Sequence, residues 1–177
     1  MDETKQNKLI IKRLLSSKTE EVLFTINKLR NTGNKNVVPF LIEILATHKD
    51  EKVKESILKL LFDLKYQSAA DGIVKGIKSD KYAIIHKDLL QVCWQSTIDF
   101  SMYVDVFVEM FIKGDFEECF EAFTVIENIE TKIDAEMVDN SIAALKFEIN
   151  NIEENKKELL IGLVHILENL KKTENRS

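Results

Sequence analysis

Glu117 and Glu121 are the residues whose spacing comes nearest to that of a metal site. They lie four positions apart in a segment with helical periodicity, so their carboxylates are expected on one side of a helix. Helical proteins complete such a site with a Glu-x-x-His motif from another helix, and this sequence contains none. We therefore predict no metal and no cofactor.

Two cysteines and three histidines are the other residues that could do chemistry, and their surroundings favour packing or surface roles. Cys93 and Cys119 fall on apolar helical faces, where a free thiol behaves as a small apolar side chain. Acidic residues near Cys119 would raise its pKa rather than create a reactive thiolate. His48 falls in an expected turn, and His86 and His165 fall within expected helices. We predict no catalytic residue.

Polar side chains that recur at helical spacing are the candidates for binding a partner. They are Lys52, Glu55, Lys59, Lys87, Gln91, Trp94, Glu117, Glu118 and Glu121. Every amphipathic helix has such a solvated face, so a partner-binding face and a plain surface both remain open. Trp94 either packs between neighbouring helices or anchors a ligand.

Acidic residues gather in one part of the chain. The net charge is −5, and residues 115–139 contain nine Asp or Glu against one basic residue, Lys132. A concentrated acidic surface speeds the encounter with a basic partner, although it can also serve solubility alone. We expect a partner protein, basic or neutral, and no membrane or small-molecule ligand. The acidic balance argues against nucleic acid, which needs a basic groove.

Composition and periodicity predict one all-α domain over residues 1–177. The chain is 45% hydrophobic and 31% charged, with 5 Gly and 1 Pro, which is too little punctuation for a fold of strands and turns. Apolar residues repeat every three or four positions along almost the whole length. No secretory signal or membrane span is evident, so we expect a cytoplasmic protein.

The helices are expected as five antiparallel pairs, because helical segments alternate with short turns. The pairs are residues 5–31, 35–65, 67–97, 100–130 and 134–172, with a polar tail at 171–177. The second helices are expected to begin near Ser17, Asp50, Asp80, Asp115 and Asn151.

Short local patterns mark the expected helix ends. Capping boxes are predicted at Ser17–Glu20, Asp115–Glu118 and Asn151–Glu154. Asp50, Asp80 and Asp134 are predicted N-caps. Pro39 is expected in a first helical turn, and Gly33 and Gly114 at helix ends with positive φ.

One segment, Asn36 to Lys65, resembles a HEAT repeat. Pro39 begins its first helix, an acidic turn follows, and Val53 and Ile57 take the expected positions in the second helix. Lys54 departs from the arginine that the family often has there. The resemblance implies a right-handed α-α superhelix, armadillo-like, with a binding surface along the second helices.

Three functional classes follow from these features. The first is a non-catalytic interaction or scaffold module that binds a partner along the second-helix face. The second is a helical-repeat enzyme or nucleic-acid-binding protein, of the DNA-repair glycosylase or chromophore-lyase type, with a cleft near Tyr82, Asp88 or Trp94. The third is a subunit that docks through an unusually apolar final helix.

Overall fold

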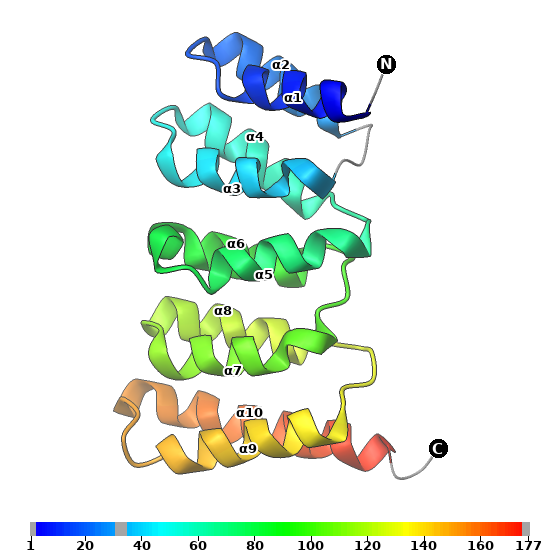
Figure 1. Cartoon of the computed structure of the whole chain (residues 1–177). Coiled ribbons are helices and arrows are strands. Elements are labelled where there is room, and N and C mark those ends of the chain that lie inside the picture. The colour runs from blue at the N-terminus through cyan, green and yellow to red at the C-terminus, as the bar shows by residue number, and fades with distance from the viewer. Residues whose placement is uncertain (1–2, 31–34, 175–177) are drawn as a thin grey trace. The chain divides into compact units, whose positions relative to one another are not determined.

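The computed structural model describes residues 3–30 and 35–174, and all regular structure within them is helical, as predicted. The longer helices form pairs, and short 3-10 turns precede several of them (Figure 1). None of the described helices combines the length and apolar character that crossing a membrane requires.

The chain forms two compact units, Met1–Ile98 and Asp99–Ser177. The first contains α1 (Glu3–Leu14), α2 (Thr19–Leu29), α3 (Val38–Thr47), α4 (Glu51–Phe62), α5 (Ala70–Ile77) and α6 (His86–Gln95). The second contains α7 (Val104–Lys113), α8 (Phe116–Glu127), α9 (Ala135–Glu148) and α10 (Lys157–Glu174). Each predicted pair corresponds to two of these helices.

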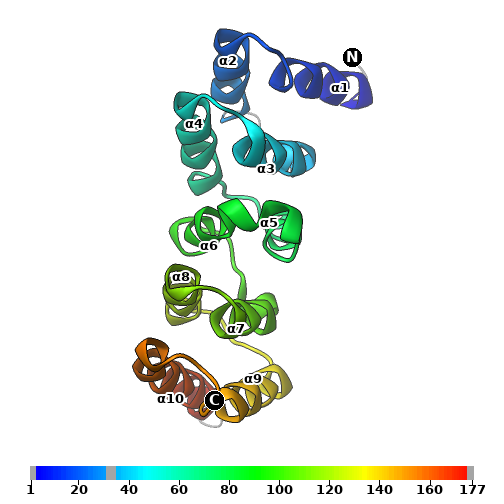
Figure 2. The same cartoon turned by 90° about the vertical axis from the view of Figure 1, so that its left-hand side faces the viewer.

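The first unit has two layers of helices. The first helices of successive pairs contact one another, α1 with α3 and α3 with α5. The second helices do the same, α2 with α4 and α4 with α6, as the end-on view shows (Figure 2). Between the layers lie apolar side chains at helical spacing, among them Leu41 and Leu45 of α3 and Ile57 and Leu61 of α4.

The second unit repeats this arrangement with four helices. Here α7 packs on α8 and on α9, while α10 packs on α8 and on α9. Its core holds larger side chains, because Phe107 and Phe111 of α7 are fully buried. Leu160 and Leu163 of α10 are buried with them. Val138 and Leu145 turn the inner face of α9 toward this core and leave its other side exposed.

Four of the predicted helix-end signals are confirmed. Asp50 caps α4, because its side chain accepts a hydrogen bond of 2.9 Å from the Lys52 amide. Asp115 and Glu118 form the predicted capping box at the start of α8. Asp134 caps α9, because its side chain accepts a hydrogen bond of 3.1 Å from the Met137 amide. Pro39 lies in the first turn of α3, where its missing N–H costs nothing.

The capping box predicted at Ser17–Glu20 is wrong. Helix α2 has Lys18 as its N-cap, and no side chain hydrogen-bonds there. The neighbouring Ser16 instead donates a bond of 2.7 Å to Glu21 and accepts one from the Lys18 amide. Only Ser17 fits the pattern, with Glu20 three positions later, yet its neighbour makes the local hydrogen bonds, so the pattern alone does not determine which residue caps the helix.

The capping box predicted at Asn151–Glu154 is also wrong. A 3-10 turn, η5 (Glu154–Lys156), precedes α10, and its N-cap is Glu153. The side-chain amide of Asn151 instead donates to the Glu148 carboxylate at 3.2 Å. Asn151 therefore hydrogen-bonds to the last residue of α9 and does not cap the start of α10.

Three further signals have different outcomes. Asp80 is not an N-cap, because it is the first residue of the 3-10 helix η3 (Asp80–Ile85), whose N-cap is Ser79. Helix α6 therefore begins later than expected. Gly114 does end α7, but its φ is −67° and not positive. Gly33 lies outside the described residues.

Candidate functional site

The partner-binding candidates of the first unit lie on α4 and α6, the second helices of their pairs, as predicted. Lys52, Glu55 and Lys59 are exposed on α4. On α6, Lys87 is exposed, whereas Gln91 and Trp94 are half-buried. Since α4 and α6 are in contact, the two stripes occupy neighbouring helices of one layer.

The acidic candidates on α8 have three different environments. Glu117 is exposed. Glu118 is half-buried, and its carboxylate accepts a hydrogen bond from the Asp115 amide in the capping box. Glu121 is buried, with 9% of its surface exposed. The stripe read from the sequence is therefore not a uniform acidic face, because one member caps the helix and another lies inside the unit.

The cysteines are buried and free of disulfide bonds, as expected from their apolar positions. Burial raises the pKa of Cys93 well above its ordinary value. Burial also raises the pKa of Cys119 to about 11, although the nearby Lys156 ammonium opposes that shift. Within residues 3–30 and 35–174, no three His, Cys, Asp or Glu side chains gather in a way that could hold a metal ion.

A polar cluster in the first unit joins η3 to α3. The Glu43 carboxylate accepts hydrogen bonds from the Lys81 ammonium and from the Tyr82 hydroxyl, the latter at 2.8 Å. These two bonds, the one from Lys81 most of all, lower the pKa of Glu43. The cluster lies on the surface, and we assign it a structural role in holding η3 against α3.

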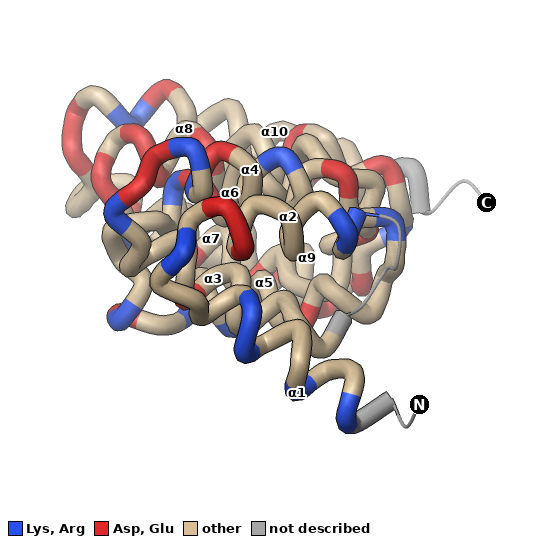
Figure 3. The backbone as a smooth tube through the Cα atoms, turned by 90° about the horizontal axis from the view of Figure 1, so that it is seen from above, with Lys and Arg blue, Asp and Glu red and all other residues tan. Residues whose placement is uncertain are grey.

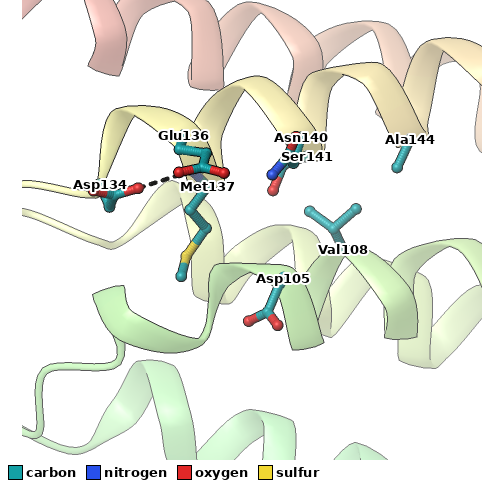
Figure 4. Close-up of a pocket in the computed structure, with 8 residues that line it drawn as sticks. All are labelled: Asp105, Val108, Asp134, Glu136, Met137, Asn140, Ser141 and Ala144. Carbon is teal, nitrogen blue, oxygen red and sulfur yellow. Dashed lines mark hydrogen bonds between the residues drawn. The ribbon is translucent and has the colours of Figure 1, made fainter.

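A concave site lies elsewhere, between the first helices of the second unit. One pocket of about 360 Å³ opens between α7 and α9, and Figure 4 labels the residues that line it. Val108 points from α7 toward α9, and Met137 points from α9 toward α7 (Figure 4). Ser141 and Ala144 continue the α9 wall, and Asp105 stands at the start of α7.

A second pocket, of about 350 Å³, adjoins the first. The two share Asp105, Val108 and Ala144. The second extends along α7 to Ile112 and along α9 to Phe147, whose side chain is 77% exposed. We call the two pockets together the α7–α9 groove.

Helical spacing explains why these residues share one groove. On α7 the lining residues stand at intervals of three and four, from Asp105 through Val108 to Ile112. Met137, Ser141 and Ala144 follow the same rule on α9, with Phe147 and Glu148 after them. Val108 and Ser141 are buried, at 3% and 4% exposed, so they form the floor where the groove meets the core, while Ala144 and Phe147 are exposed along it.

Helix α9 is held in this orientation from its other side. Lys146 donates to Glu168 of α10 at 3.0 Å, and Lys171 of α10 pairs with Asp139. These ion pairs span the contact between α9 and α10. The groove stripe of α9 is thereby left facing α7 and solvent.

The groove is strongly acidic. Its lining contains five carboxylates and one ammonium group. The carboxylates belong to Asp105, Glu109, Asp134, Glu136 and Glu148. The ammonium group of Lys113 is already paired with Glu109, at 2.6 Å. Asp105 and Glu136 also lie in the first turns of their helices, where a negative charge stabilises the helix dipole.

Sequence reasoning missed this groove. It placed the binding surface on second helices, whereas α7 and α9 are both first helices of their pairs. Among the groove residues, Asp134 was predicted only as an N-cap and as part of the acidic stretch 115–139, and Glu136 only as part of that stretch. The usable signal was the small and apolar stripe of Met137, Ser141 and Ala144, which is exposed or only partly covered apart from Ser141.

Comparisons with known proteins do not place the chain in a family. No family model matches it, and no curated protein matches it. Among solved structures, the crystal structure of an engineered protein aligns with a TM-score of 0.47 at 13% identity. That alignment covers 92% of this chain and 79% of the engineered one. A likeness of this degree supports no inference about function.

Proposed function

We propose that the chain is a non-catalytic protein-binding module made of HEAT-like helix hairpins, with the α7–α9 groove as a contact site for a partner protein. The observation that carries the proposal is the groove's construction. Its floor is apolar, formed by Val108, Ile112 and Ala144, and its rim is charged. Protein interfaces share this anatomy, a dry apolar centre inside a polar rim.

The HEAT-like part of the proposal rests on the second pair and on the layering. Pro39 opens α3, Asp50 caps α4, and Val53 and Ile57 are fully buried. First and second helices form separate layers within each unit. A right-handed superhelix is the arrangement that we propose for such hairpins, and stacking them builds the continuous core that one hairpin lacks.

A protein partner suits the groove better than nucleic acid does. Its carboxylates would repel phosphate groups, which bind where Lys and Arg displace counterions. The two pockets are also lined by none of Tyr82, Asp88 and Trp94, the residues that the enzyme hypothesis placed in a cleft. The groove therefore favours the interaction module.

A pair of tryptophan substitutions on α9 tests the proposal. Ala144 lines both pockets, and its neighbour Ala143 is also exposed but lines neither. The tagged full chain is used to capture proteins from a cell extract. We expect Ala144→Trp to fill the groove, so that specific proteins captured by the unmodified chain are no longer captured. Ala143→Trp should retain them. If Ala144→Trp retains every protein that the unmodified chain captures, the groove is not the contact site.

A further inference from the structure

We infer that the occupant of the α7–α9 groove is an amphipathic helix of a partner protein that carries lysine or arginine beside its apolar face. This inference rests on the proposed function and names the partner's chemistry. It depends on three properties of the groove: the nature of its walls, its length and its charge.

The walls favour a helix over an extended segment. Both are α-helices, whose backbone groups are already paired along the helix, so the groove offers its occupant side chains only. An extended chain lying on Val108 and Ala144 would bury its own N–H and C=O groups without partners. A helix satisfies those groups internally and can place its apolar face on the floor.

The length of the groove fits a short helix. The α9 wall runs from Asp134 to Glu148, about 21 Å at the rise of an α-helix, and the α7 wall is shorter. A partner helix of about 14 residues, or four turns, spans that distance. Its apolar side chains at i, i+3 or i+4 and i+7 would meet Val108, Ala144 and Ile112.

The charge of the groove selects a basic occupant. Carboxylates stand at both ends of the apolar floor, Asp105 and Glu136 at one and Glu148 at the other. Lys113 adds little positive charge, because Glu109 already pairs with it. A helix with Lys or Arg on its flanks complements this rim, whereas an acidic helix is repelled.

The test uses the purified full chain and synthetic peptides of about 14 residues. The probe peptide has leucine on one helical face and lysine on its flanks. One comparison peptide has glutamine in place of lysine, and another has the same composition as the probe in scrambled order. Peptide binding is followed by fluorescence anisotropy of a labelled peptide. We expect the lysine peptide to bind, and the other two to bind at least ten-fold more weakly.

Charge reversal in the groove has a matched control. Asp105 is the second residue of α7, and Asp71 is the second residue of α5 in the other unit. Both substitutions remove a favourable charge at a helix start, and Asp71→Lys also breaks the exposed ion pair with Lys75. We expect Asp105→Lys to weaken binding of the lysine peptide, and the further substitution Glu136→Lys to bring the loss of affinity to at least about ten-fold. The single control Asp71→Lys should change the affinity less than two-fold. Binding should also weaken as salt rises, because the rim is exposed.

The outcomes separate this inference from the proposed function. If the lysine and glutamine peptides bind equally and Ala144→Trp abolishes both, the groove binds helices but the basic partner is wrong. If the scrambled peptide binds as well as the ordered one, binding depends on composition and not on an apolar helical face, and the proposal of a docked helix is wrong. If Asp105→Lys instead dissolves a self-association of the chain, the occupant is the basic helix α1 of a second copy, whose lysines recur along its length (Figure 3). Loss of extract proteins with Ala144→Trp remains a separate test of the function.

Discussion

The ammonium group of Lys156 donates a hydrogen bond of 2.6 Å to the carbonyl oxygen of Gly114, although the lysine side chain is only 4% exposed. Gly114 is the C-cap of α7, and Lys156 ends the 3-10 turn that precedes α10. A cation at the C-terminus of a helix satisfies a carbonyl that lacks an intrahelical partner and stabilises the helix dipole. This bond ties the start of α10 to the end of α7, one wall of the groove.

Removing that ammonium group should destabilise the second unit. We expect Lys156→Ala to lower the free energy of unfolding by about 1.5–3 kcal/mol, because a partly buried carbonyl loses a charged donor. Lys157 is the control, since it pairs with Glu154 at the surface. Lys157→Ala should cost about 0.5 kcal/mol or less. Urea denaturation of both variants measures the difference, and equal losses would show that the buried bond contributes nothing special.

Two glycines of this unit should respond to alanine in opposite directions. A Cβ at Gly114 would lie 2.6 Å from the Met110 carbonyl oxygen and 2.7 Å from the Glu118 Cβ, so Gly114→Ala should cost about 1–3 kcal/mol. A Cβ at Gly162 would meet only the Phe123 ring, at 3.5 Å. Gly162→Ala should therefore stabilise α10 by about 0.5–1 kcal/mol. Thermal unfolding checks both signs, and a stabilising Gly114→Ala would refute the steric argument.

Burial of Cys119 predicts a loss of stability in alkali. Its pKa is about 11 in the folded protein, against an ordinary value of 9.0. The folded thiol keeps its proton to higher pH than the unfolded thiol does. The contribution of the buried Cys119 thiol to the free energy of unfolding is therefore complete below about pH 9 and is lost as pH rises toward 11. We expect the free energy of unfolding of the unmodified chain to fall more steeply over this range than that of Cys119→Ala, and parallel curves would contradict this.

The Glu43 cluster predicts the opposite pH dependence. Hydrogen bonds from Lys81 and Tyr82 lower the pKa of Glu43 below its ordinary 4.5. The stability that they confer is present at neutral pH and is lost as pH falls through the lowered folded value. Glu43→Gln should accelerate amide hydrogen exchange in η3 at pH 7 and have little effect in strong acid. Tyr82→Phe, which removes one of the two donors, should have a smaller effect. Equal exchange in all three proteins at pH 7 would contradict the assignment.

The helices could be predicted because their signals lie within a few residues of one another. The groove could not, because it depends on residues that are distant in the sequence and meet only in the folded chain. Asp115 and Glu118 are three residues apart, and the hydrogen bonds between them form within one helical turn, so the sequence contains the whole device. Ser17 and Asn151 fit similar patterns, but the N-caps that follow them, Lys18 of α2 and Glu153 of η5, have no side-chain hydrogen bond. Competition among nearby polar groups is decided by backbone conformation, which residue types alone do not specify.

The candidate site shows the same limit more strongly. Val108 and Ala144 face one groove although 36 positions separate them in the chain. Their meeting depends on how α9 packs against α7 and α10, and no local pattern contains that information. The prediction that Glu121 lies on an exposed acidic stripe is wrong, because the residue is buried. Helical spacing places it on the same side of α8 as Glu117 but does not show which part of that side the core covers.

The most direct test of the central claim locates the bound peptide on the full chain. Backbone amide chemical shifts should be followed while the leucine–lysine peptide is added. We expect the largest changes on both walls of the groove, at Val108 and Ile112 of α7 and at Ser141 and Ala144 of α9. Largest changes on the second helices, at Lys52 or Glu117, or no saturable change at either wall, would contradict it.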